Sequence, residues 1–342
     1  MTRALAAAQA RAGAPLAAGT AFLVLVVLAS TAAAVAEPAA EESLHAAGEA
    51  AERHSFRGVL LMRWSEGTTK RAKSLLVEAA EGSVVVRGDT AAIASPRQRL
   101  VEHDGEWDLL WPVPQRGPDR PSPARKYRVQ AVPGGTIDGR ATRIVEFSYG
   151  GVLLERLHFD TATDLLLRRE QFDGGPSPSR TIGFEKLTIG PADIAPGMPE
   201  KVVNATATSV TGKRLPSGVS APEQLPDSYQ RLGVFRRSDV TQVLYSDGLY
   251  DLSVFQQEGR LDRSDLPGGQ KMQIGKRTGW HYVWPGGHLV VWEARGVVHT
   301  AISDAPLSQV MAAVTSIPLT GGSASLLRRL RQVCRALVQP LV

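Results

Sequence analysis

The residues best suited to chemistry are three histidines in the last third of the chain. His281, His288 and His299 fall on successive predicted strands between residues 272 and 302. If the strand register brought them to one face of a sheet, they could bind a metal ion or, with an ordinary pKa of about 6.5, respond to pH. No carboxylate or cysteine recurs beside them at ligand spacing, so we expect ordinary strand residues and no metal site.

Acidic pairs and glycine-rich loops offer no catalytic alternative. Asp160 with Asp164, and Asp262 with Asp265, lie in predicted turns, where aspartate hydrogen-bonds the backbone. The segment 269–276 is one residue too long between its glycines for a phosphate-binding loop. Motifs of the types H-E-x-x-H, G-x-S-x-G, S-x-x-K and C-x-x-C do not occur in the sequence. We therefore expect a protein that is not an enzyme and uses no cofactor.

Length and charge favour a two-domain binding protein. The 342 residues are enough for two domains with their own cores, and the single cysteine, Cys334, excludes an intrachain disulfide. Of 39 basic residues, two lie in residues 1–36 and four in the last 20, which leaves 33 against 34 acidic residues. Because the body of the chain is nearly neutral, we expect no nucleic-acid partner.

Residues 1–36 have the order of a secretory signal peptide. Arg3 and Arg11 precede an apolar run at 21–28, and small residues end at Ala36. An uncleaved anchor is the alternative, because residues 14–36 are long enough to span a bilayer. On either interpretation the protein is exported and extracytoplasmic.

The region 37–199 predicts a first domain of the α+β class. Leu44, Ala47 and Ala51 recur at helical spacing, and short apolar runs separated by polar turns follow. The strand-like runs are Phe56–Trp64, Lys73–Ala79, Ser83–Arg87, Arg99–His103 and Trp107–Trp111. One helix and many short strands suggest a half-barrel.

A proline-rich linker, 200–224, leads to a second domain at 225–318. Its most distinctive stretch is LYSDGLYDLSVF at 244–255, in which two strand-like runs flank Ser246-Asp247-Gly248, a hairpin pattern. A meander is predicted from Met272 to Ile302. A helix that Asp304 caps should follow, with Leu307, Val310, Met311 and Val314 on its apolar side.

Several of these stretches resemble the RseB/MucB family. The string Tyr245–Tyr250 resembles the motif that opens the family's C-terminal domain, and Ile137–Val145 resembles its Gly-Arg turn and the strand that follows. Later strands and turns are matched by Arg156–Asp160, Leu165–Arg168 and Phe172–Gly175. The resemblance covers about residues 40–318.

The resemblance implies a fold and a function. The first domain would be a curved antiparallel half-barrel sheet with helices on its concave side, as in the lipoprotein carriers LolA and LolB. The second would be a smaller antiparallel sheet with a packed helix. The implied function is that of a non-catalytic regulator that binds the extracytoplasmic domain of a membrane anti-sigma factor, modulates sigma-factor signalling in envelope stress and senses a lipid or lipoprotein. The alternative is a lipid or lipoprotein carrier at the membrane surface.

Candidate site residues follow from these expectations. An apolar cavity in the first domain could accept acyl chains, and its candidate lining is Trp107, Trp111, Phe147 and Leu154, unless these are plain core. Tyr245 and Tyr250 are candidates for partner contact, although a structural use would also explain them.

The tail, 319–342, predicts a basic amphipathic helix. Leucines and valines share one side of it, and the other side carries Arg328, Arg329, Arg331 and Arg335. This helix could lie on an anionic membrane surface, or it could dock on the second domain with its arginines solvated.

Overall fold

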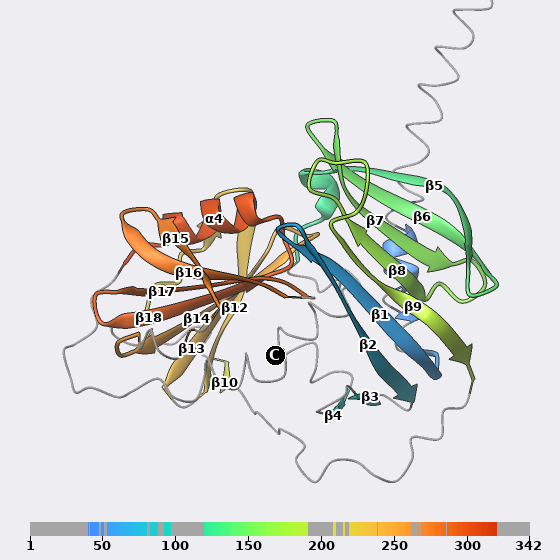
Figure 1. Ribbon diagram of the computed structural model, residues 1–342, viewed down its shortest axis with the longest axis horizontal. Coiled ribbons are helices and arrows are strands. Elements are labelled where there is room, and N and C mark those ends of the chain that lie inside the picture. The colour runs from blue at the N-terminus through green and yellow to red at the C-terminus, as the bar shows by residue number, and fades with distance from the viewer. Residues whose placement is uncertain are drawn as a thin grey trace, which may run out of the picture.

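The computed structural model describes residues 40–80, 83–87, 92–96, 120–190, 208–209 and 215–319, apart from short gaps at 41, 48, 51–52, 216–218, 238, 262–265, 267 and 285. The predicted signal segment, the predicted strands at 99–103 and 107–111 with Trp107 and Trp111, and the four tail arginines lie outside these residues. In the described part the strands form two antiparallel sheets of nine strands each (Figure 1). Helices are few, which agrees with the α+β class.

The first sheet has the strand order β4-β3-β2-β1-β9-β8-β7-β6-β5. Every neighbour along the sheet is also a neighbour in sequence, except that β9 lies beside β1. The strands are β1 (Phe56–Glu66), β2 (Thr69–Ala80), β3 (Ser83–Arg87), β4 (Ala92–Pro96), β5 (Arg128–Ile137), β6 (Arg140–Tyr149), β7 (Val152–Asp160), β8 (Leu166–Gln171) and β9 (Arg180–Ile189). The predicted strand at 83–87 is confirmed to the residue, and those at 56–64 and 73–79 fall within β1 and β2.

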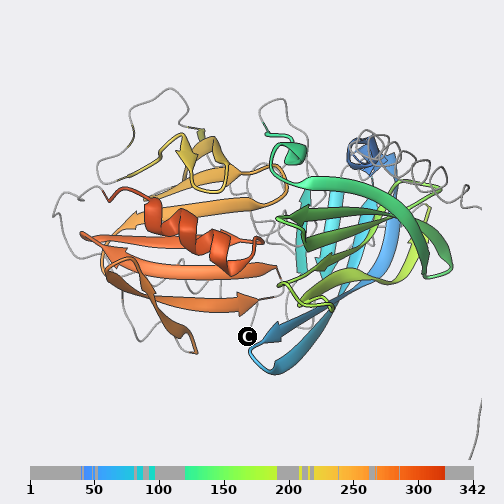
Figure 2. The same ribbon diagram turned by 90° about the horizontal axis from the view of Figure 1, so that it is seen from above.

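An N-terminal helix covers one face of this sheet. Residues 40, 42–47, 49, 50 and 53 are helical, and the side chains of Leu44 and Ala47 are buried in one cluster with Val145 and Phe147 of β6. We call this side of the sheet the helix-covered face. Figure 2 shows the helix beyond the green strands, on one side of the sheet.

The second sheet has the order β10-β12-β13-β14-β18-β17-β16-β15, with β11 also paired to β12. Its strands are β10 (Thr208–Ser209), β11 (Gln224–Leu225), β12 (Tyr229–Arg237), β13 (Val240–Ser246), β14 (Asp251–Glu258), β15 (Gln270–Ile274), β16 (Arg277–Trp284), β17 (Gly287–Ala294) and β18 (Val297–Ser303). The expectation of a smaller sheet was wrong in strand number, because β10 and β11 come from the predicted linker and its border. The predicted meander at 272–302 is confirmed as β15 to β18.

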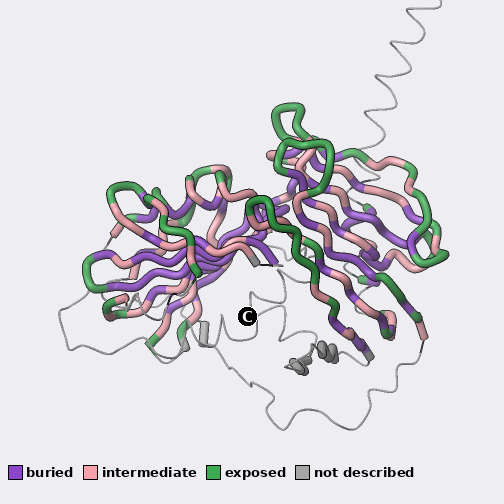
Figure 3. The backbone as a smooth tube through the Cα atoms, in the orientation of Figure 1, coloured by how far each residue is buried: buried purple, intermediate pink, exposed green. Residues whose placement is uncertain are grey.

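One helix, α4 (Leu307–Ser316), packs on the second sheet. Val310, Ala313 and Val314 are buried in the same cluster as Val290 and Trp292 of β17. That cluster continues into the first domain, so a single hydrophobic core crosses from one sheet to the other. Figure 3 shows buried residues along the strands of both sheets. None of the helices among the described residues has both the length and the apolar character needed to cross a membrane.

Candidate functional site

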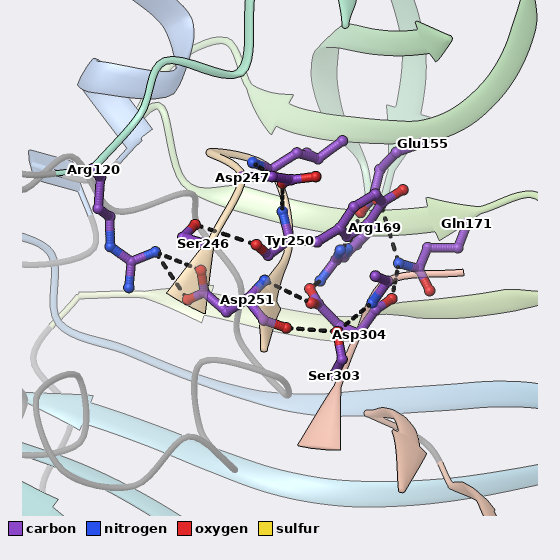
Figure 4. Close-up of polar contacts among 12 residues, drawn as sticks. Arg120, Glu155, Arg169, Gln171, Ser246, Asp247, Tyr250, Asp251, Ser303 and Asp304 are labelled. Carbon is purple, nitrogen blue, oxygen red and sulfur yellow. Dashed lines mark hydrogen bonds and ion pairs between the residues drawn. The ribbon is translucent and has the colours of Figure 1, made fainter. Parts of the chain in front are cut away.

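The strand ends of the second sheet meet the first domain and define the candidate site. β13 ends at Ser246, β14 begins at Asp251 and β18 ends at Ser303. These three neighbouring strand ends therefore lie together at one end of the strands. The facing residues of the first domain come from the segment before β5 and from β7 and β8. We call this contact the junction. Its main members are Arg120, Lys126, Tyr127, Glu155, Arg169, Gln171, Asp247, Tyr250, Asp251 and Asp304; Figure 4 labels all of them except Lys126 and Tyr127.

The predicted hairpin at 244–255 is confirmed and supplies the centre of the junction. Asp247 Oδ1 accepts hydrogen bonds from the backbone N–H groups of Leu249 at 3.0 Å and Tyr250 at 2.8 Å. These bonds hold 247–250 as a loop, so the second strand begins at Asp251, two residues later than predicted. The carboxylate therefore shapes the turn and leaves its other oxygen for the first domain.

Gly248 is required at this turn for two reasons. Its φ is +96°, and a Cβ would lie 2.4 Å from the carbonyl oxygen of Pro121 and 2.7 Å from the nitrogen of Pro123. We expect Gly248→Ala to lower the free energy of unfolding by about 2 kcal/mol or more, measured by urea denaturation. Gly67→Ala is the matched control, because Gly67 also has a positive φ, +59°, but a Cβ on Gly67 would meet no atom within 4 Å. Equal losses in the two variants would show that the close approach is unimportant.

Two ion pairs cross the junction beside this loop. Asp247 Oδ2 accepts from Lys126 Nζ and from the Tyr127 hydroxyl, each at 2.5 Å. Arg120 Nη1 donates to both carboxylate oxygens of Asp251, at 3.0 and 2.9 Å. The Lys126–Asp247 pair is almost completely buried, with side-chain exposures of 5% and 0%. Such a pair constrains the orientation of the domains more than an exposed pair would, because neither charge can turn to water.

The third crossing is a buried guanidinium between two carboxylates. Arg169 on β8 bonds Glu155 of β7 through Nε and, at 3.0 Å, through Nη2, and its Nη1 lies 2.7 Å from Asp304 Oδ2. Gln171 Nε2 donates to Glu155 Oε2 at 3.1 Å and to the Asp304 carbonyl oxygen at 2.7 Å. The ring of Tyr250 lies 5.8 Å from the Arg169 guanidinium carbon, within cation–π range.

The prediction that Asp304 caps a helix was wrong. α4 begins after Pro306, which makes no side-chain capping bond. The Asp304 carboxylate instead contacts Arg169 and accepts from the Asp251 N–H at 3.1 Å. A buried arginine attracts this carboxylate because charge pairing gains more in a desolvated site than at an exposed helix end.

Burial controls protonation in the junction. It raises the pKa of Asp304, and Arg169 partly offsets this effect. Burial also raises the pKa of Tyr127 far above its usual value, and the neighbouring Asp247 carboxylate adds to the shift. Tyr127 therefore stays protonated and donates its hydrogen bond. Every cation that crosses the junction comes from the first domain and its partner aspartate from the second, so the two surfaces are electrostatically complementary.

The predicted contact residues are part of this core. Tyr250 is fully buried against Tyr127, with ring centroids 6.0 Å apart, and Tyr245 is 1% exposed. Phe147 is fully buried under the N-terminal helix, and Leu154 packs at the border of the same cluster. Their roles at a partner or a lipid remain predictions. For Tyr250, direct contact with a partner would require the junction to open.

Sequence reasoning missed the Arg169 contacts. One pattern could have indicated them: Leu167 and Arg169 alternate along β8, so a charged side chain occupies a position on the buried face. Its partner Asp304 lies 135 positions away, and no local pattern joins the two.

The three histidines do not form one cluster. His281 Nε2 lies 2.9 Å from His288 Nδ1, whereas His299 stacks on Trp292 with ring centroids 4.9 Å apart. Among the described residues, no group of three or more His, Cys, Asp or Glu side chains could hold a metal ion. Burial lowers the pKa of all three rings, to about 4 for His299.

This burial predicts loss of stability in weak acid. A histidine whose pKa is lower in the folded state takes up its proton at a higher pH in the unfolded chain than in the folded one. Its contribution to the free energy of unfolding is therefore complete above about pH 6.5 and is lost as the pH falls toward 4. We expect acidification from pH 7 to 4.5 to lower the free energy of unfolding by about 2 kcal/mol through His299. His299→Gln should remove this part of the pH dependence. Urea denaturation at both pH values measures it. His45→Gln, at a 60% exposed side chain, should leave the slope unchanged; an identical slope in all three proteins would contradict the prediction.

Of three comparisons with known proteins, only the comparison with solved structures found matches. No family model matches the chain, and no curated relative matches it. A structure of MucB in complex with MucA(peri) is 19% identical, with 83% of this chain and 100% of that one covered and a TM-score of 0.46. The Pseudomonas aeruginosa MucA/MucB complex is 19% identical, with 83% of this chain and 99% of that one covered and a TM-score of 0.47. A structure of MucB alone is 20% identical, with 82% of this chain and 98% of that one covered and a TM-score of 0.47. These are structures of the family that the motifs at 137–175 and 244–255 resemble.

Proposed function

We propose that the chain is a non-catalytic extracytoplasmic regulator that binds the extracytoplasmic domain of a membrane anti-sigma factor. The observation that supports this most is the place of the string Tyr245–Tyr250, the stretch that most resembles the RseB/MucB family. It forms the buried joint between the two domains, through Asp247 to Lys126 and Tyr127. The motif therefore fixes the relative orientation of the domains, on which any partner surface formed by both domains depends.

A lipid or lipoprotein would act on this complex through the first domain. We infer that the sheet functions as a half-barrel, with acyl chains on its helix-covered face beside Phe147 and Leu154, and with Trp107 and Trp111 as further lining. A ligand shifts binding of the partner only if its affinity differs between the free and the bound regulator. Since Phe147 and Tyr127 belong to one continuous core with Tyr250, packing offers a route from this face to the junction.

Export and membrane contact complete the proposal. Residues 1–36 would direct the protein out of the cytoplasm, and the basic tail would add affinity for anionic lipid through Arg328, Arg329, Arg331 and Arg335. Both features would place the protein beside a membrane-anchored partner.

A protection assay tests the proposed function. We infer that the regulator shields the anti-sigma factor from the protease that first cleaves it, the site-one protease. The extracytoplasmic domain of an anti-sigma factor from the same genome is therefore incubated with this protease, with and without residues 37–342 of the protein. We expect the protein to slow cleavage and added acyl lipid to restore it. Unchanged cleavage for every anti-sigma factor tested would reject the regulator, and acyl lipid recovered from the same protein by extraction and mass spectrometry would then favour the carrier.

A further inference from the structure

Arg180 is a largely buried cation that forms no ion pair with the described residues. It begins β9 on the helix-covered face and is only 9% exposed. In the described part of the chain its guanidinium makes no hydrogen bond and no ion pair, whereas Arg120, Lys126 and Arg169 in the same region each have a carboxylate within 3.0 Å. Asp304 and Asp173 act on this charge only without direct contact, and a buried charge that lacks a directly bonded partner costs stability.

A second unsatisfied donor lies beside it. Trp64 on β1 is directly opposite Arg180 in the antiparallel register, which places the two side chains on the same face of the sheet. The indole Nε1–H of Trp64 is buried and has no hydrogen-bond acceptor among the described residues. Buried donors normally have acceptors, so an unpaired indole N–H directly across from an arginine that forms no ion pair with the described residues points to a group that would serve both.

The surroundings define what that group can be. Arg169, Asp304, Asp173 and Tyr250 act electrostatically on Arg180, and Arg180 in turn helps to lower the pKa of His288, across the junction, to about 2. His288 is therefore neutral and does not supply a competing charge. The complement of a guanidinium and an N–H donor is an oxyanion, and a carboxylate has the geometry and the single charge that balance one arginine.

We propose that Arg180 and Trp64 form a subsite for one carboxylate, supplied by an acidic residue or a chain end of the polypeptide partner. This inference rests on the proposed function for the identity of the partner. The junction already pairs three other cations of the first domain with aspartates of the second, so a partner carboxylate would occupy a position that the described residues of the second domain leave unfilled. Binding the partner would then be coupled to the junction, because Arg180 interacts electrostatically with Arg169 and His288.

The first test uses acetate as the probe and the indole proton of Trp64 as the reporter. In ¹H–¹⁵N spectra of residues 37–342, Trp64→Phe identifies one of six indole signals. We expect sodium acetate, up to about 100 mM, to shift that signal with saturation, and Arg180→Gln to abolish the shift. Arg168→Gln, one strand away on the opposite face, should leave it intact. Equal shifts with sodium chloride, or a response to phosphate or phosphatidylglycerol vesicles but none to acetate, would overturn the proposal.

The second test uses the anti-sigma segments themselves. For a segment that binds the wild type, we expect Arg180→Gln to weaken affinity at least tenfold, Trp64→Phe severalfold, and Arg168→Gln less than twofold. Without partner, Arg180→Gln should melt at the same temperature as wild type or higher, which shows that the loss is not misfolding. Unchanged affinity in Arg180→Gln would reject the partner's use of the subsite while the proposed function stands. If no segment binds the wild type, the proposed function fails, and the acetate titration alone decides the subsite.

Discussion

Arg169→Ala is expected to lower the free energy of unfolding by about 3–5 kcal/mol, the largest effect of any single substitution in the junction. The change leaves Glu155 and Asp304 buried without their shared cation, and both carboxylates are almost inaccessible, with side-chain exposures of 0% and 3%. Urea denaturation measures the loss, and calorimetry should show the two domains unfolding less cooperatively than in the wild type.

The neighbouring Arg168 provides the control for this substitution. Its side chain points to the opposite face of β8 and is 36% exposed. Its ion pair with Glu170 is long, with 3.8 Å between Nη1 and Oε1. Arg168→Ala should cost less than about 1 kcal/mol, as expected for exposed ion pairs. If both alanine variants lose the same stability, the buried triad does not hold the domains together.

Asp247→Ala is the second large effect, about 3 kcal/mol or more. It removes the partner of the buried Lys126 ammonium and of the Tyr127 hydroxyl, and it also removes the acceptor that shapes the 247–250 loop. Two mechanisms therefore add at one side chain. Urea denaturation gives the stability, and limited proteolysis should find cleavage between the domains that is absent from the wild type.

Asp239→Ala serves as the matched control for Asp247. Asp239 is exposed and accepts one hydrogen bond, from Gln257 Nε2 at 2.8 Å. Its loss should stay within about 0.5 kcal/mol. Tyr127→Phe, which removes one of the two side-chain donors to Asp247 Oδ2, should fall between the two aspartate variants. A wild-type proteolysis pattern in Asp247→Ala would contradict its proposed role at the junction.

Local chemistry explains what the sequence could predict. The turn at Ser246-Asp247-Gly248 was predictable because aspartate bonds its own backbone and glycine tolerates a positive φ, and both occur. Strand β3 and the 270–303 meander were predictable from alternation and turn residues. Each of these features is decided by residues within about ten positions of one another.

The junction was not predictable, because its contacts join distant parts of the chain. Asp304 precedes a helix and looks like its cap, yet a guanidinium 135 positions earlier binds it. Lys126 lies 121 positions before Asp247. Likewise, the histidines were correctly expected on neighbouring strands, but only the register decides that His281 meets His288 and that His299 meets Trp292.

We infer that the buried charges of the junction contribute more to the choice of one domain orientation than to net stability. Apolar residues in place of Arg169, Glu155 and Asp304 could hold the domains as firmly but would not select one orientation so strictly. A regulator that must switch needs such a selective contact, because two arrangements can differ by only a few kcal/mol. Under the proposed carboxylate subsite, a partner would bias this balance at Arg180, which forms no ion pair with the residues that the structure describes.

Calorimetric titration of residues 37–342 with the extracytoplasmic segments of the anti-sigma factors encoded in the same genome tests the central claim most directly. We expect one segment to bind with a Kd of about 1 μM or tighter, a binding free energy of about −8 kcal/mol. Saturation at one segment per chain would support a specific complex. If no segment gives a heat of binding at protein concentrations of about 100 μM, the proposal that the protein is a regulator of an anti-sigma factor is contradicted.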